Sequence, residues 1–157
     1  MSELALREAT LADADLLREW RNDPIVRQNS FTQDVIAPDT HRAWLERKLA
    51  ANSGTKIWIL TSDGEPAGQV RYDRDGDVAE VSVSIDGRFR GAGFGVAILT
   101  MSAPRACAEF GVREIRALVK LTNAPSLAAF TRAGFVRGAD VDVHGDASAS
   151  FAWRCAR

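Results

Sequence analysis

The chain has 157 residues, a length that suits one domain with a sizeable core. Lysine plus arginine (20) and aspartate plus glutamate (21) nearly cancel, and the formal net charge is −1. Because there is no overall positive field, binding to nucleic acid or to an anionic membrane is not expected, and the apolar content of 46% is typical of a globular protein.

The first third of the chain predicts one strand and two helices. The first stretch, LALRE, alternates apolar and polar residues like a half-buried strand. Thr10 or Asp13 can cap the helix that follows, and Pro24 ends or redirects it. Trp44 and Leu45 belong to the apolar face of the second helix. The expected elements are a strand at 4–8, a helix at 10–23, a loop at 26–37 and a helix near 38–51.

The remaining chain predicts a run of strands and two more helices. Asp-Gly pairs at 63–64 and 75–76 separate alternating segments, which is a good hairpin signal. Pro104 lies inside the next helix and should kink it or cost a backbone hydrogen bond, and Asn123 can cap the last helix. The expected elements are strands at 56–62, 67–74 and 78–86, a helix at 93–110, a strand at 114–121, a helix at 123–134, and strands near 135–143 and 149–155. This order predicts an α/β domain on a mixed sheet.

The two cysteines, Cys107 and Cys155, are far apart in sequence, and the chain has only two histidines. A metal site or a disulfide is therefore not expected, and a reducing compartment fits. The first ten residues carry three charges and no apolar stretch, so no secretion signal is expected. No run approaches about 20 apolar residues. We expect a cytoplasmic domain.

The segment RFRGAGFG, residues 88–95, stands where the strand at 78–86 should give way to a helix. The start of a helix offers unpaired N–H groups, glycines let a ligand approach the backbone, and Arg88 and Arg90 could add charge-assisted contacts. Two other phosphate motifs fail, because Val96 stands where a dinucleotide fingerprint needs glycine and no Gly-Lys-Ser/Thr is present. The alternatives are a phosphate cradle and a plain glycine-rich turn.

Together with the later NAPSLAAFTRAGF, residues 123–135, this segment resembles the GCN5-related N-acetyltransferases (GNAT family), over residues 4 to about 155. The resemblance implies a single-domain α/β fold with a mixed, mostly antiparallel sheet of about seven strands and helices on both faces. It also implies that a bulge splays the strand at 78–86 from the strand at 115–120, and that acetyl-CoA binds in the gap. The cofactor-binding residues expected from it are Val83, Ile85, Arg88, Arg90, Gly91, Ala92, Gly93, Phe94, Gly95, Asn123, Ser126 and Phe130.

Transfer of an acetyl group from a thioester to an amine needs a neutral amine, a stabilised oxyanion and a leaving thiolate. The resemblance places a catalytic glutamate at about Glu80, although Glu80 could equally be a solvent-facing strand residue. Phe130 stands where many relatives have the tyrosine that protonates the thiolate, so Ser126 or water would have to serve. Phe130 could instead be a core aromatic. The catalytic residues expected are Glu80 and Ser126.

Residues 18–31 and 41–49 resemble, within the family, enzymes that acetylate a nucleotide-linked 4-amino sugar on the pseudaminic acid route. Trp20 or Phe31 could stack on a base, although a core position is favoured for Trp20. The substrate-binding residues expected are Arg21, Asn22, Arg27, Asn29, Ser30 and His41, and for His41 an exposed helix position is the favoured alternative. Other functions left open are acetylation of a protein N-terminus and a non-catalytic acyl-CoA-binding module. We expect a monomer or homodimer without metal.

Overall fold

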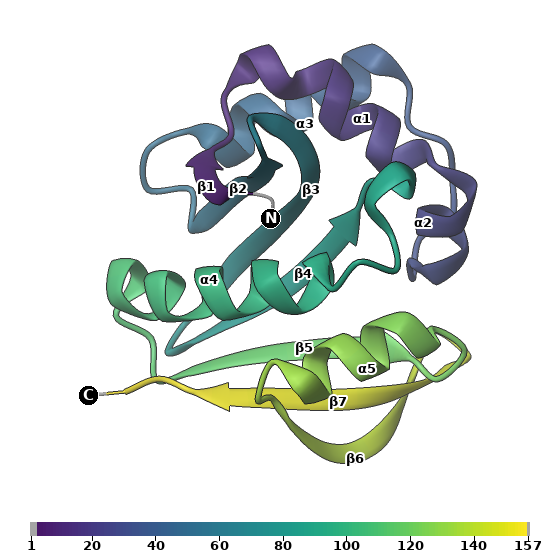
Figure 1. The fold of residues 1–157 in the computed structure, drawn as a ribbon, viewed down its shortest axis with the longest axis vertical. Coiled ribbons are helices and arrows are strands. Elements are labelled where there is room, and N and C mark those ends of the chain that lie inside the picture. Colours follow the sequence, from purple (N-terminus) through teal and green to yellow (C-terminus); the bar gives the residue numbers. More distant parts are fainter. Residues whose placement is uncertain (1–2, 157) are drawn as a thin grey trace.

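A computed structural model describes residues 3–156, which form one seven-stranded sheet in the order β1-β2-β3-β4-β5-β7-β6 (Figure 1). The strands are β1 (Leu4–Glu8), β2 (Thr55–Ser62), β3 (Glu65–Asp75), β4 (Val78–Ile85), β5 (Glu114–Lys120), β6 (Val136–Val143) and β7 (Asp146–Arg154). The helices are α1 (Ala14–Asn22), α2 (Pro24–Asn29), α3 (Pro38–Leu49), α4 (Phe94–Phe110) and α5 (Ala124–Arg132). Only β4 and β5 pair in parallel, so the sheet is mixed and mostly antiparallel, which confirms the predicted fold class.

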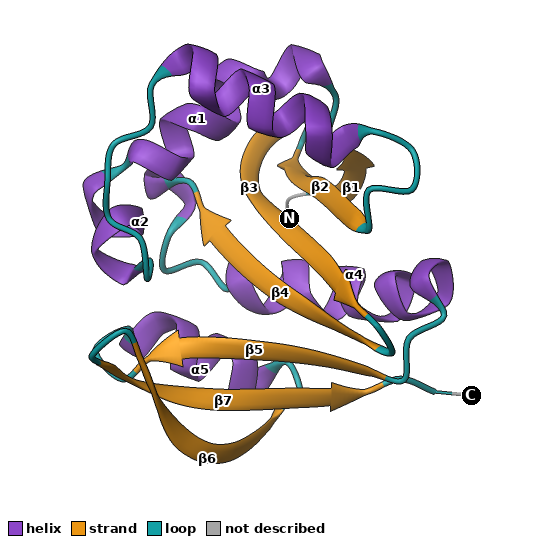
Figure 2. Cartoon of the chain, turned by 180° about the vertical axis from the view of Figure 1, so that it is seen from behind, coloured by secondary structure: helices purple, strands orange, loops and turns teal. Residues whose placement is uncertain are grey.

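Helices cover both faces of the sheet because the strands alternate two apolar sets. On β2, Ile57 and Ile59 pack with α1 and α3, whereas Trp58 and Leu60 pack with α4 on the opposite face. Strand residues one apart point to opposite faces, so one strand contributes to two cores. Figure 2 shows α1 and α3 together over the β1–β3 end, with α4 and α5 behind the strands.

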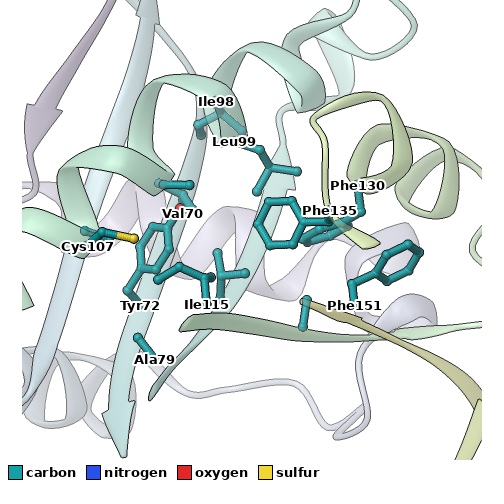
Figure 3. Packing of buried hydrophobic residues seen from close by; sticks show 14 of the residues in the cluster. Val70, Tyr72, Ala79, Ile98, Leu99, Cys107, Ile115, Phe130, Phe135 and Phe151 are labelled. Atoms are coloured by element: carbon teal, nitrogen blue, oxygen red, sulfur yellow. The ribbon is translucent and has the colours of Figure 1, made fainter. Parts of the chain in front are cut away.

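The larger core lies between the sheet and helices α4 and α5 (Figure 3). Tyr72 is fully buried there, and its hydroxyl forms a hydrogen bond of 2.6 Å with Ser102 of α4. Phe130 of α5 stacks on Phe151 of β7, with 5.4 Å between ring centroids, and meets Phe135 edge-on at 5.0 Å. These aromatic contacts hold α5 against β7.

Part of the segment predicted as a loop at 26–37 is helical. The Asp23 carboxylate accepts hydrogen bonds from the backbone N–H groups of Ile25 (2.8 Å) and Val26 (3.4 Å), and Pro24 occupies the first turn. An aspartate cap followed by proline is a known helix-start signal, so the sequence did contain the information. The short α2 therefore begins at the proline that was expected only to end α1.

β4 and β5 separate soon after they meet, as Figure 2 shows. Their parallel pairing covers only Val78–Glu114, Ala79–Ile115 and Glu80–Arg116. The rest of β4, residues 81–85, pairs with β3 alone, and that pairing has no register shift. The predicted splay is therefore present, but the bulge expected in β4 is not. The structure has its irregular pairings in β2–β3 and β6–β7 instead.

Cys107 and Cys155 form a disulfide, contrary to the expectation from their spacing. α4 and the segment after β7 both end near Arg113, whose carbonyl accepts a hydrogen bond from the Cys155 N–H, and the two Cα atoms lie 5.7 Å apart. This distance suits a disulfide. Sequence spacing could not reveal the pair, because 48 residues separate the cysteines and only the fold brings them together. The expectation of a reducing compartment rested on the absence of a disulfide, so it no longer has support.

Candidate functional site

The turn between β4 and α4 is the predicted cradle, and glycines give it its shape. Gly91 and Gly93 have φ values of +78° and +82°, a left-handed conformation that side chains with a Cβ rarely adopt. A Cβ built on either glycine would meet no atom within 4 Å. The backbone of this turn therefore faces open space, which is what a bound ligand would need.

The first turn of α4 has unused donors. Gly93 is its N-cap, has no side chain to cap the helix, and accepts the first intrahelical bond, from the Ala97 N–H at 3.1 Å. The N–H groups of Phe94, Gly95 and Val96 lie before that bond, at the positive end of the helix dipole. This arrangement suits a phosphate or pyrophosphate.

The two arginines expected to assist the cradle are both paired with carboxylates. Arg88 Nε lies 3.1 Å from Asp86, and Arg90 lies 3.5 Å from Asp23, the cap of α2. Asp86 also accepts a hydrogen bond of 2.8 Å from the indole of Trp20. Trp20 is buried in the smaller core, as favoured from the sequence, and it anchors α1 to the cradle.

α5 approaches the cradle from the other side of the gap. A Cβ on Gly95 would lie 3.3 Å from that of Ala129, so this glycine permits close packing of α4 on α5. Asn123 caps α5 as predicted, accepting a hydrogen bond of 3.3 Å from the Ser126 N–H. Ser126 is half-buried, one turn before Ala129, and thus lies on the side of α5 that meets α4.

A tyrosine cannot supply the proton for a leaving thiolate here. Phe130 is 3% exposed within the aromatic cluster, which supports the core interpretation and leaves little of its ring for a ligand. Tyr72 is the only tyrosine of the chain, and it is fully buried and bonded to Ser102. Burial raises the pKa of its hydroxyl, and the bond from Ser102 offsets this only in part. Ser126 and water remain as candidates.

Glu80 lies at the point where β4 and β5 begin to separate. It is the last β4 residue that pairs with β5, opposite Arg116, and its side chain is exposed. Ala79 and Val81 point into the core beneath α4, so Glu80 points to the opposite face. Val83 and Ile85 follow on the strand, are half-buried against the larger core, and have no β5 partner.

Glu80 also lines a hollow of about 390 Å³ on that face of β5, β6 and β7. Its walls are mostly apolar, and Leu118 and Val136 are exposed in it. The donor groups of the cradle and the Glu80 carboxylate therefore lie on opposite sides of the same strand. Two molecules could therefore reach the gap between β4 and β5 from opposite faces of the sheet.

Some of the residues predicted to bind the acceptor form hydrogen bonds within the protein, whereas others keep polar atoms without such bonds among the described residues. Asn22 uses both ends of its amide on Ile36, at 2.9 and 2.8 Å, and the Ser30 hydroxyl donates to the Val26 carbonyl at 2.7 Å. These two residues hold the backbone in place, and their assignment as substrate contacts stays a prediction. Asn29, the last residue of α2, is half-buried. Arg21 donates to the Thr32 carbonyl at 2.7 Å but leaves one guanidinium nitrogen without a partner.

His41 is 4% exposed, so the favoured expectation of an exposed helix position was wrong. α3 turns this residue inward against α1, and its ring lies 5.4 Å from that of Trp44. Burial lowers the pKa of the imidazole, and the charges of Arg18 and Arg21 lower it further. The ring is therefore neutral near pH 7, with Nδ1 lacking a hydrogen-bond partner among the described residues.

Sequence reasoning missed Lys120 and Arg71. The side chain of Lys120 is 6% exposed, and its ammonium donates to the Gln28 carbonyl of α2 (3.1 Å) and pairs with Asp146 (3.4 Å). It thereby ties α2 to β5 and β7 across the open end of the gap. Arg71 of β3 lies over the ring of Trp44, 5.2 Å from its centroid. No local motif marks either residue, because their partners are distant in sequence.

Within residues 3–156 no cluster of three or more His, Cys, Asp or Glu side chains is arranged to hold a metal ion. None of the helices in the same range is long and apolar enough to cross a membrane.

The family model described as "Acetyltransferase (GNAT) domain" matches residues 3–136, and the chain belongs to this family. It is thus an N-acetyltransferase domain whose acetyl donor is acetyl-CoA. The predicted family is confirmed. The finer resemblance to amino-sugar enzymes is not tested by this match.

Individual relatives differ in the acceptors that their names give. A mycothiol acetyltransferase of Amycolatopsis mediterranei (strain U-32) is 34% identical over 116 residues, which are 70% of this chain but only 37% of that protein. A spermidine N-acetyltransferase from Vibrio cholerae, solved with CoA and spermine, aligns with a TM-score of 0.85 at 14% identity over 96% of this chain and 95% of that chain. The aminoglycoside acetyltransferase AAC(6′)-Ib with coenzyme A gives 0.81 at 17% identity, over 97% and 95%. The two structures show the fold alone.

Proposed function

We propose that this protein transfers the acetyl group of acetyl-CoA to a primary amine, with a nucleotide-linked amino sugar as the acceptor, by direct attack in a ternary complex. The observation that carries the proposal is the separation of β4 from β5 immediately after Glu80. Beyond Glu80, molecules bound on the two faces of the sheet can both reach the edge of β4 that has no strand partner, at residues 81–85.

On the donor side, the uncapped N–H groups of Phe94, Gly95 and Val96 bind the pyrophosphate, and Gly91 and Gly93 let it approach. The β5-facing edge of residues 81–85 binds the amide groups of the pantetheine arm. Strand backbone recognises an extended chain in this way because every second N–H and C=O on that edge has no strand partner.

Glu80 is the base in this proposal. It takes a proton from the ammonium, and the neutral amine nitrogen attacks the thioester carbon. A backbone N–H between Val83 and Ile85 stabilises the oxyanion. The C–N bond forms, the attacking nitrogen loses its second proton to water, and the C–S bond breaks. The thiolate takes a proton from water, or from the Ser126 hydroxyl, which water then reprotonates. A free thiol has a pKa of about 8.5, so the thiolate is a tolerable leaving group near neutral pH.

The amino-sugar acceptor rests on residues 18–31 and 41–49. Arg21 and Arg27 each retain a buried guanidinium nitrogen with no partner among the described residues, and such groups can bind phosphate or sugar oxygens. The similarity to a mycothiol acetyltransferase agrees with a small-molecule amine rather than a peptide. Because the chain spans 37% of that relative's length, its acceptor is not carried over.

The test is CoA release from acetyl-CoA, with the product mass checked, in the presence of a UDP-linked 4-amino-4,6-dideoxy sugar or a panel of N-terminal peptides. We expect turnover on the sugar. Turnover on peptides alone would overturn the acceptor and keep the acetyltransferase. A protein that binds acetyl-CoA but acetylates neither would contradict the proposed acceptor and favour a non-catalytic acyl-CoA-binding module.

A further inference from the structure

Four partly buried arginines come from neighbouring elements on one face of the sheet. Arg18 and Arg21 come from α1, Arg27 from α2 and Arg71 from β3, and each is half-buried. Arg27 and Arg71 are charged neighbours of Arg21: burial lowers the pKa of Arg21, and the charges of Arg71 and Arg27 lower it further. Arg18 and Arg21 are both close enough to His41 for their charges to lower its pKa. A cluster of like charges that is withdrawn from water is unfavourable without a counter-ion.

The guanidinium groups are incompletely satisfied. Arg18 Nε, Arg21 Nη1 and Arg27 Nε are buried and have no hydrogen-bond partner in the part of the chain that the structure describes. Within residues 3–156, none of these three arginines has a carboxylate at ion-pair distance. Buried donors without acceptors are rare in folded proteins, and they indicate a place for a missing acceptor.

The nearby acids do not neutralise the cluster. Asp73 pairs with Arg71 at 2.9 Å, but it also pairs with Lys48 at 3.4 Å and accepts a hydrogen bond from Thr55. Asp34 would raise the pKa of Arg21, but it is the smallest of the influences on that residue, and the pKa is lowered overall. His41 beside the cluster is neutral and adds no charge of either sign. The surroundings thus leave a local excess of positive charge in a protein whose net charge is −1.

The register of the strands places this cluster beside the candidate base. Arg71 is the direct cross-strand partner of Ser82, and side chains of such partners share one face. Ser82 lies two residues beyond Glu80, roughly 7 Å along β4. In Figure 2, α2 lies across from the diverging ends of β4 and β5, on the same side as α1. An amine at Glu80 could therefore carry a group that reaches the arginines.

We infer that Arg18, Arg21, Arg27 and Arg71 form an anion subsite, so that the acceptor is an amine that also carries a phosphate or carboxylate group. This inference rests on the proposed function for the position of the amine, but it extends the subsite to Arg18 and Arg71. It selects against polycationic amines, because these would face the same four charges. Charge-assisted contacts to a desolvated guanidinium supply both the affinity and the orientation of the acceptor.

The experiment measures binding in the absence of turnover. UDP and succinate serve as a phosphate probe and a carboxylate probe, each titrated into protein saturated with CoA so that the α4 cradle is already filled. The variants are Arg21→Gln and Arg71→Gln. Arg42→Gln is the matched control, because Arg42 is an exposed arginine of α3 that pairs with Glu46.

We expect at least one probe to bind, and its affinity to fall about tenfold or more in each variant but not in Arg42→Gln. UDP binding alone identifies a phosphate, and succinate binding alone a carboxylate. If neither probe binds, or if the control loses as much affinity as the variants, the subsite is refuted. Binding that follows this pattern without turnover on any amino sugar would refute the proposed acceptor and leave the subsite in place.

Discussion

Asp73 of β3 and Glu80 of β4 are direct cross-strand partners, so two carboxylates stand side by side on the face of the sheet that carries Arg71. The Asp73 carboxylate accepts hydrogen bonds from the Thr55 hydroxyl at 2.7 Å and from Arg71 at 2.9 Å. Burial would raise the pKa of Asp73, but these contacts together with Lys48 outweigh it, and the pKa is lowered. Among residues 3–156, no side chain pairs with the Glu80 carboxylate. Asp73 is held as a structural anion, whereas Glu80 stays free for chemistry.

We expect Glu80→Gln to lower kcat/KM by about 100-fold, mainly at lower pH, where the amine is protonated and a base is needed. The measurement is a pH–rate profile of acetyl transfer for the wild type and the variant. Glu65→Gln, an exposed glutamate at the opposite end of β3, is the control and should leave the profile unchanged. A Glu80→Gln profile identical to that of the wild type would make Glu80 a solvent-facing strand residue.

His41 should make stability depend on pH. Its pKa in the folded protein is lowered by burial and by Arg18 and Arg21, so the unfolded chain binds a proton first as the pH falls. Stability is therefore fully present above the unfolded pKa of about 6.5. It decreases below that value, by up to about 1.4 kcal/mol per pH unit, until the folded pKa is passed.

Urea unfolding at several pH values tests this prediction. His41→Gln should flatten the dependence between about pH 6.5 and the folded pKa, even if the variant is less stable throughout. His144→Gln is the control, because His144 lies in the exposed turn between β6 and β7. A wild-type stability that does not fall with pH in this range would contradict the buried neutral ring.

Reduction of the disulfide should destabilise the protein. Cys107–Cys155 closes a loop over 48 residues and holds α4 to the end of β7, which corresponds to about 2–4 kcal/mol. Thermal unfolding with and without reductant, combined with counting of free thiols by mass, measures the effect. Cys107→Ala/Cys155→Ala should unfold like the reduced wild type and ignore the reductant. An unfolding temperature that does not respond to complete reduction would contradict the prediction.

Phe130 should matter for folding rather than for proton transfer. Its ring is 3% exposed between Phe135 and Phe151, so Phe130→Ala should cost about 3–5 kcal/mol. Phe130→Tyr should not raise kcat, since the added hydroxyl would enter an aromatic cluster. Denaturant unfolding and steady-state kinetics provide the two readouts. A Tyr variant with a higher kcat and unchanged stability would show instead that the ring reaches the thiolate.

The sequence predicted most of the fold because local signals and tertiary structure agree along most of the chain. Alternation on β2, the Asp-Gly turns and the Asn123 cap each act within a few residues, and all were confirmed. The exception is α2, where the Asp23 cap and Pro24 were read as the end of one helix rather than the start of another. A local signal such as Asp23-Pro24 marks a helix boundary, but it does not show whether the helix lies before or after that boundary.

The acceptor side was less predictable, because its residues act through distant partners. Asn22 and Ser30 were chosen for their polar side chains, yet the Asn22 amide of α1 bonds to the backbone of Ile36 and the Ser30 hydroxyl bonds to the carbonyl of Val26. Arg71 could not be assigned, since only the strand register brings it beside Ser82. The disulfide was missed for the same reason, because only the fold brings Cys107 and Cys155 together. A resemblance in sequence identified the donor site, but spatial pairing decides which polar groups remain free.

The turn at Gly91–Gly93 and the start of α4 are proposed to bind the pyrophosphate of acetyl-CoA. The most direct test is calorimetric titration of acetyl-CoA into the wild type, Gly93→Asn and Gly93→Asp. Asparagine tolerates the left-handed conformation of this N-cap, and aspartate has the same size but adds a negative charge. Both substitutions carry the same backbone strain at this φ, so the difference between the two variants reports the added charge.

We expect weakened binding for Gly93→Asn and no measurable binding for Gly93→Asp. Equal affinities for the Asp variant and the wild type would contradict this expectation, and the phosphate cradle would have to be abandoned.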